Sequence, residues 1–119
     1  MPVTNFPINL QDKIFRSLSN TGNGEVDAAT HFHYRQSGEI IWATYSGGQI
    51  RFGTLSGFMD QTGALTFCYQ HQNEEGNFMT GKCHSLPEWT SENKLRYREY
   101  WQWTSGDGSS GESIIEQVD

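Results

Sequence analysis

The residues best suited to recognise a small molecule fall in one alternating stretch near the end of the chain. Every second position from 95 to 103 carries Leu95, Tyr97, Glu99, Trp101 or Trp103, and the positions between them are basic or polar apart from Tyr100. Alternate residues of a β-strand share one face, so this pattern predicts a strand with rings and one carboxyl group on its inner face. A buried carboxyl group must find a partner or take up a proton.

Glu99 therefore has two interpretations. In the first, it lies near a barrel mouth or bonds to Tyr45, His71 or an indole N–H and only stabilises the interior. In the second, it lines a ligand cavity together with neighbouring polar and aromatic side chains. The candidate ligand-binding residues are Tyr34, Tyr45, Phe52, Tyr69, His71, Tyr97, Glu99, Trp101 and Trp103. No catalytic residue and no cofactor is predicted.

Three other motifs favour ordinary structural roles. His31 and His33 share one strand face, but the sequence offers no third and fourth metal ligand, so no metal site is expected. Cys68 and Cys83 fall on opposite faces in the predicted register and are expected to be free thiols. The stretch 105–111 is rich in Gly and Ser but is followed by no Lys, so it predicts a hairpin loop rather than a phosphate-binding loop.

Composition and turn residues define the elements that position these side chains. Thirteen glycines and sixteen aromatic residues in 119 favour strands and turns over helices. We expect one all-β domain over 1–119, with a terminal extension at 1–12 and a polar, mobile loop at 20–29. The predicted strands are 13–18, 30–36, 39–45, 49–56, 64–72, 77–84, 94–104 and 112–118.

Eight strands joined by short loops predict an antiparallel meander. Such a meander exposes its edges unless it closes, and closure at eight strands gives a barrel that is packed or holds one small ligand. We therefore expect a calycin-like up-and-down barrel, with a two-sheet sandwich as the alternative.

Hairpin geometry predicts which residues face inward. Two-residue loops at Gly47-Gly48 and Ser37-Gly38 place Phe52 opposite Ala43 and Tyr34 opposite Ile41. The predicted interior is Phe32, Tyr34, Ile41, Ala43, Tyr45, Ile50, Phe52, Thr54, Phe67, Tyr69, His71, Met79, Cys83, Leu95, Tyr97, Glu99, Trp101 and Trp103. In the last strand, either Ser113, Ile115 and Gln117 or Ile114, Glu116 and Val118 face inward.

The net charge of the chain limits the classes of partner that it can be expected to bind. A net charge of -6 argues against nucleic acid and against an anionic membrane surface. No apolar run approaches the roughly 20 residues that span a bilayer, and the first residues do not resemble a signal peptide, so a cytoplasmic location is expected.

Trp42 is predicted on the outer face near Ile40 and Leu55, where it covers a glycine or forms a homodimer contact.

Three segments carry a resemblance to a known group: 45–50 (Tyr-Ser-Gly-Gly-Gln-Ile), 79–83 (Met-Thr-Gly-Lys-Cys) and 99–107, which contains Trp-Gln-Trp-Thr-Ser-Gly-Asp. From about residue 13 onward the chain resembles small bacterial proteins often labelled "N-acetylglutamate synthase". That label implies an acetyltransferase whose phosphate-cradling loop opens a helix. The nearest match, 35–40, leads into a predicted strand instead.

Three functions follow from these observations. The favoured one is a cytoplasmic barrel that binds a small, partly apolar or aromatic ligand in its interior. The alternatives are an acetyltransferase, as the label implies, and a non-catalytic dimerisation or interaction module. In its architecture alone the chain is also similar to the lipocalin and streptavidin barrels, but architecture does not determine function.

Overall fold

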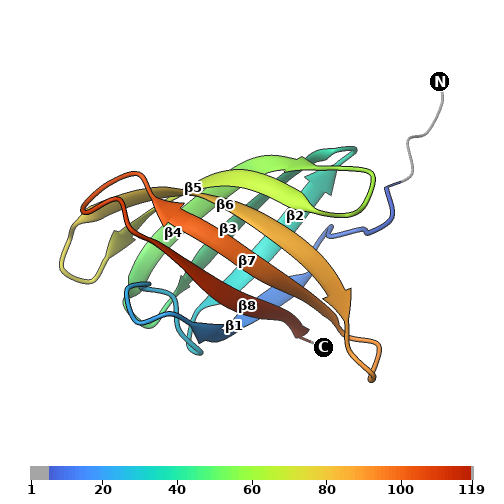
Figure 1. Cartoon of the computed structure of the whole chain (residues 1–119), viewed down its shortest axis with the longest axis horizontal. Coiled ribbons are helices and arrows are strands. Elements are labelled where there is room, and N and C mark those ends of the chain that lie inside the picture. Colours follow the sequence, from blue (N-terminus) through green and yellow to red (C-terminus); the bar gives the residue numbers. More distant parts are fainter. Residues whose placement is uncertain (1–5, 119) are drawn as a thin grey trace.

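The chain forms one closed antiparallel β-barrel. The structure is a computed structural model that describes residues 6–118, and all its regular elements are strands. Each strand pairs with the next along the chain, and the first pairs with the last, which closes the barrel (Figure 1). The strands are β1 (Ile14–Asn20), β2 (His31–Ser37), β3 (Ile40–Gly47), β4 (Ile50–Met59), β5 (Leu65–Asn73), β6 (Phe78–Trp89), β7 (Leu95–Trp103) and β8 (Ser110–Val118).

The barrel confirms the predicted fold class and excludes the two-sheet sandwich. All eight strands overlap the ranges that the turn residues predicted. Closure pairs the strand edges that an open meander would leave to aggregate. Over residues 6–118, no helix is long and apolar enough to cross a membrane.

The two ends of the barrel are built from different connections (Figure 1). At one end lie the loops that join β1 to β2, β3 to β4, β5 to β6, and β7 to β8, and we call this the open end. At the other lie the N-terminal segment and the β2–β3, β4–β5 and β6–β7 turns, and we call this the closed end. The N-terminal segment was expected to be an extension, but Ile8 and Leu10 are buried in the core. Chain before β1 therefore helps to fill the closed end.

A bulge at the β3–β4 hairpin corrects the predicted register. Gly47, at φ 114°, pairs with Ile50, and the register shifts between Tyr45 and Gly47, so Tyr45 lies opposite Gly53 rather than Ile50. A backbone at that φ favours glycine, which is why the bulge forms there.

A second irregularity follows between Ile50 and Phe52 where β4 pairs with β5. The extra residue reverses the alternation along β4. Phe52 is consequently 56% exposed and Thr54 half-buried, whereas Leu55, expected outside, is buried. The prediction that Phe52 and Thr54 face the interior is wrong.

The registers of the other hairpins differ less from the predicted registers. The β2–β3 turn is displaced along the chain, so Tyr34 lies opposite Ala43 rather than Ile41, but a shift of two residues keeps Tyr34 facing inward. The predicted pairs of β5 and β6 are confirmed, including Tyr69 opposite Gly81. In β8, Ser113 and Ile115 face inward, which decides between the two alternatives.

Candidate functional site

A cavity lies inside the barrel near the open end. Its volume is about 50 Å³. Since each buried water needs about 10–15 Å³ of such space, the cavity has room for roughly four waters or a group of similar size. It is lined by Asn20, Gly24, Glu25, Val26, Phe32, Tyr45, Leu55, Phe67, Tyr69, His71, Cys83, Glu99, Trp101, Trp103 and Ser113.

Aromatic rings form the walls of the cavity. Trp101 and Trp103 meet edge to face with their ring centres 5.4 Å apart, and Tyr69 packs against Trp103 at 5.8 Å. The ring of Tyr69 lies across Gly81 on the neighbouring strand, so closely that any side chain at that position would overlap it. This contact turns the ring against the barrel wall and leaves the centre open.

Glu99 lies at the inner side of the cavity with two serines. Its Oε2 accepts a hydrogen bond from the Ser85 hydroxyl at 3.1 Å, and its Oε1 accepts one from Ser113 at 3.0 Å. Ser85 Oγ is also 3.5 Å from Cys83 Sγ. The side chains come from the neighbouring strands β6, β7 and β8, and inward alternation places all of them in the interior.

Burial controls the charge of Glu99. The residue is only 7% exposed, and burial raises the pKa of its carboxyl group to about 7, while the bonds from Ser113 and Ser85 work in the opposite direction. Near neutral pH the carboxyl group is therefore divided between its protonated and ionised forms. A group in this state can accept or donate hydrogen bonds in response to a ligand.

A second polar group closes the mouth of the cavity. His71 Nε2 lies 2.8 Å from Oε1 of Glu25, and His71 Nδ1 lies 2.9 Å from the Tyr45 hydroxyl. Asn73 Nδ2 donates to the other Glu25 oxygen at 3.0 Å. Burial lowers the pKa of His71 more than the bond and charge of Glu25 raise it, so the ring is neutral at pH 7. These partners assign the proton to Nε2, which donates to Glu25, while Nδ1 accepts from Tyr45.

The β1–β2 loop, residues 21–30, covers this mouth. Besides the two bonds of Glu25, the indole N–H of Trp101 donates to Asn20 Oδ1 at 3.0 Å, just before the loop. The indole N–H of Trp103 donates to the Asn23 carbonyl at 3.1 Å. The segment that composition predicted as polar and mobile is thus tied to the cavity walls by side-chain hydrogen bonds.

The structure brings together most of the predicted candidates. Tyr45, Tyr69, His71, Glu99, Trp101 and Trp103 all line the one cavity. Tyr34 and Tyr97 are fully buried but do not line it, and the Tyr97 hydroxyl donates to the Gly63 carbonyl at the closed end. Phe52 lies on the outer surface, because of the bulges described above.

Sequence reasoning missed the loop and two serines. Glu25 and Asn20 could have been found from one signal, namely that 20–29 is the longest connection of a barrel whose other loops are short. Long connections at the mouth of a scaffold are where binding residues concentrate. Ser85 and Ser113 carried no signal of their own, because Ser85 follows the predicted strand 77–84 and the inward face of the last strand was left open.

The residues predicted to have structural roles lie apart from the cavity, except for one cysteine. His31 and His33 are exposed on the outer face of β2, and within residues 6–118 no three His, Cys, Asp or Glu side chains gather closely enough to hold a metal ion. Cys68 is exposed and Cys83 buried on opposite faces, and both are free, as expected. Cys83 lines the cavity beside Ser85.

A closed eight-stranded barrel with an internal, capped cavity is the architecture of the calycin-like proteins. The family model described as "Avidin-like protein" matches residues 8–118, and the chain belongs to this family. No curated protein and no solved structure matches the chain.

The family assignment and the fold do not support the label "N-acetylglutamate synthase". Segment 35–40, the nearest match to an acetyltransferase phosphate loop, forms the β2–β3 turn and its flanking residues. A phosphate-binding loop of that kind needs a helix N-terminus, and residues 6–118 contain no helix.

Proposed function

We propose that the protein binds a small, partly apolar or aromatic molecule in the barrel cavity and that the β1–β2 loop encloses it. The observation that carries this proposal is the position of Glu99. A carboxyl group, two indole rings and a histidine all line one cavity of a barrel whose opposite end is packed. A core needed only for stability would gain nothing from a carboxyl group held there at a cost in desolvation.

Membership of the avidin-like family supports the same function. Eight-stranded barrels of the streptavidin kind hold one small ligand, and the ligand of streptavidin itself is biotin. Biotin is larger than the present cavity of about 50 Å³, so its binding would require the β1–β2 loop to move outward. It is accordingly one member of the test panel and not the assumed ligand.

Thermal unfolding with a panel of metabolites that includes biotin tests this function. A molecule present at a hundred times its Kd adds about 2.7 kcal/mol of stability, which raises the Tm of a chain of this size by several degrees. Val26→Trp is designed to fill the mouth and to abolish the shift, because Val26 lines the cavity.

Ala28→Trp is the matched control, because it adds the same ring at an exposed position of the same loop. Binding that survives Val26→Trp, or a panel without any stabilising member, would contradict a ligand site in the barrel.

A second proposal concerns the outer face of β3 and β4. Ile40 and Phe58 are direct cross-strand partners there and Trp42 is their neighbour; all three are at least 38% exposed, and we call them the Trp42 patch. Leu55, expected in this patch, lies in the interior instead. The three side chains form an apolar surface that a second copy of the chain could cover.

Light scattering at high concentration tests the dimer. We expect the wild type to be dimeric and Trp42→Arg to be monomeric. Trp89→Arg is the matched control, since Trp89 is another exposed tryptophan, at the end of β6. A monomeric wild type would exclude the dimer and leave the cavity proposal untouched.

A cytoplasmic location also remains a proposal. Cys68 is exposed and unpaired, a state that a reducing compartment preserves. Fractionation of cells that express the chain naturally, with an antibody against it, would test the location. Recovery outside the cytoplasm would contradict it.

A further inference from the structure

We infer that the ligand of the barrel carries a positively charged N–H donor, an amidinium, guanidinium or ammonium group, and places it against Glu99. This inference rests on the proposed ligand-binding function and specifies the chemical class of the molecule. It follows from three features of the cavity: the acceptor capacity of Glu99, the distribution of basic residues, and the way in which the lining N–H groups are already used.

The acceptors of Glu99 are only half used by the protein. An ionised carboxylate offers about four lone-pair sites, and Glu99 accepts one hydrogen bond at each oxygen, from Ser85 and from Ser113. The residue lines the cavity and is otherwise buried. A group with two or more N–H donors could fill the remaining sites from the cavity, as planar amidinium and guanidinium groups do in bidentate pairs with carboxylates.

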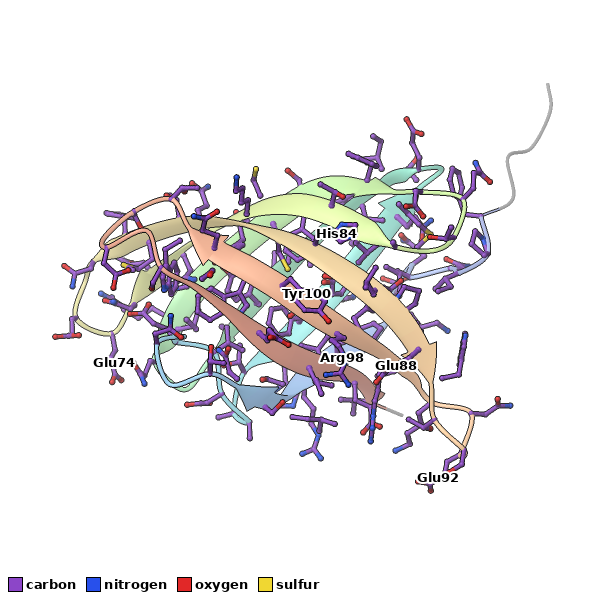
Figure 2. The ribbon with its side chains drawn as sticks, viewed as in Figure 1. Glu74, His84, Glu88, Glu92, Arg98 and Tyr100 are labelled. Carbon is purple, nitrogen blue, oxygen red and sulfur yellow. The ribbon has the colours of Figure 1, made fainter. Side chains whose placement is uncertain are left out.

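Among residues 6–118, no lysine or arginine forms an ion pair with Glu99. Within residues 6–118 no lysine or arginine is buried, and the ion pairs of the same strand form elsewhere. Arg96 pairs with Glu116 at 2.9 Å, and Arg98 lies 3.7 Å from Glu88 on the outer surface (Figure 2). A buried carboxylate without a counter-charge is costly, and a cationic ligand would supply that charge.

The indole and imidazole N–H groups of the lining already have hydrogen-bond partners in the protein. The indole N–H groups of Trp101 and Trp103 donate to Asn20 and to the Asn23 carbonyl, and the Tyr45 hydroxyl bonds at the mouth. These N–H groups are therefore not available to a ligand, whereas aromatic rings in general attract cations. The Tyr34 hydroxyl, which does not line the cavity, has no hydrogen-bond partner among residues 6–118; burial, and after it the charge of Glu99, raises its pKa.

The size of the cavity limits what fits beneath the closed loop. A volume of about 50 Å³ matches an amidinium-sized group of roughly four heavy atoms. An aromatic or aliphatic body attached to that group would have to extend past Glu25 and Val26, both of which line the mouth. Small cations are thus expected to bind with the loop closed, and larger ones only with the loop displaced.

Two isosteric series test the charge preference directly. Acetamidine, acetamide and acetate are compared at the small size, and benzamidine, benzamide and benzoate at the larger one. Each compound is titrated at pH 8 by calorimetry and by indole fluorescence. We expect each amidine to bind at least tenfold more tightly than its amide, and each carboxylate to bind least.

The pH dependence gives a second, independent readout. Glu99 is mainly ionised at pH 8 and mainly protonated at pH 5.5, so amidine affinity should fall by about tenfold or more between them. The titratable groups that interact with Glu99 are Tyr34, Tyr45, Tyr69, Cys83 and Tyr97, and because their pKa values are raised they remain neutral across this interval. Glu25 and His71 lie at the mouth, so the profile is repeated with Glu25→Gln to separate the two carboxyl groups. A pH profile that is lost in Glu25→Gln but kept in Glu99→Gln would contradict the placement of the cation against Glu99.

Glu99→Gln should remove both the charge preference and the pH profile. Glu112→Gln is the matched control, because it removes the same charge from an exposed position on β8 and should change neither. If Glu99→Gln fails to fold, the comparison of amidine with amide and the wild-type pH profile still decide the question.

Failure of this inference differs from failure of the proposed function. If amide or carboxylate binds as tightly as amidine and Val26→Trp abolishes that binding, the cavity is a ligand site without a preference for cations. If none of the six compounds binds, the preference for cations is also wrong, and the thermal panel alone decides whether the barrel binds a ligand.

Discussion

The closed and open ends of this barrel use the same eight strands for opposite purposes. At the closed end, Leu10, Met59, Leu65 and Tyr97 are buried in a continuous apolar core, and the Tyr97 hydroxyl is bonded to backbone. Towards the open end, the inward positions carry carboxyl, hydroxyl, thiol and imidazole groups around a cavity. The same eight strands enclose both ends, and the two ends differ in the side chains that those strands turn inward.

Residue size on the inner face explains why only one end is hollow. Ser85 and Ser113 occupy inward positions where a leucine or isoleucine would reach further into the barrel. Close packing makes an apolar void costly to maintain, whereas a polar cavity can be satisfied by water or a ligand. The residues that stabilise the fold and the residues proposed to bind a ligand therefore lie towards opposite ends of the barrel. Substitutions at each end test this division.

The largest expected change in the free energy of unfolding comes from a substitution at the closed end. Leu65→Ala should lower the free energy of unfolding by about 2–5 kcal/mol, because it leaves a cavity around a fully buried side chain. Val26→Ala at the open end removes less buried surface and should cost less than about 1 kcal/mol. Urea denaturation measures both. Equal losses at the two ends would contradict the division between them.

Glu99 should make stability depend on pH from the interior of the barrel. A pKa of about 7 in the folded state against 4.5 when exposed corresponds to about 3 kcal/mol. Because the folded pKa is the higher one, this stability is fully present below pH 4.5 and is lost as pH rises towards 7. Glu99→Gln should reduce the fall in stability between pH 4.5 and 8 by about that amount, measured by urea denaturation across the range. An unchanged pH profile would show that Glu99 is not buried in the way described.

The strands could be predicted well from the sequence because alternation and turn residues are local signals. The inner face of β7 follows from period-two alternation over nine residues, and this alternation alone puts Glu99 on the same inward face as Trp101. The β5–β6 register could also be predicted from a local signal, because the ring of Tyr69 leaves room only for a glycine at the position opposite it.

The errors arose where one residue changes the alternation or where distant segments meet. The bulge after Ile50 leaves the composition of β4 unchanged yet reverses its faces, so Phe52 was placed inside. Glu25 reaches His71 across 46 positions of sequence, and only the closed barrel brings the two together. Local patterns cannot predict a contact that depends on the whole topology.

The contact of Glu25 with His71 and Asn73 gives the next prediction. Glu25→Ala removes both bonds and should weaken closure of the β1–β2 loop by about 1–3 kcal/mol. Hydrogen exchange in residues 21–30 and quenching of indole fluorescence by acrylamide should both increase, while global stability changes little. Glu74→Ala is the control, since Glu74 is exposed in the β5–β6 loop at the same end (Figure 2). Unchanged exchange would show that Glu25 does not hold the loop.

Removing the hydroxyl group of either of two fully buried tyrosines should give the smallest changes in stability, and the two changes should differ in sign. The Tyr97 hydroxyl donates to the Gly63 carbonyl at the closed end, whereas the Tyr34 hydroxyl has no partner within residues 6–118. Tyr97→Phe should therefore destabilise the protein by about 1 kcal/mol, since a made hydrogen bond is lost, and Tyr34→Phe should stabilise it by a similar amount, since an unsatisfied buried group is removed. The substitutions are chemically identical, so the sign of the change depends only on location. If Tyr34→Phe is instead destabilising, its hydroxyl has a partner in solution, and the polar region around Glu99 extends deeper into the barrel than the cavity lining alone defines.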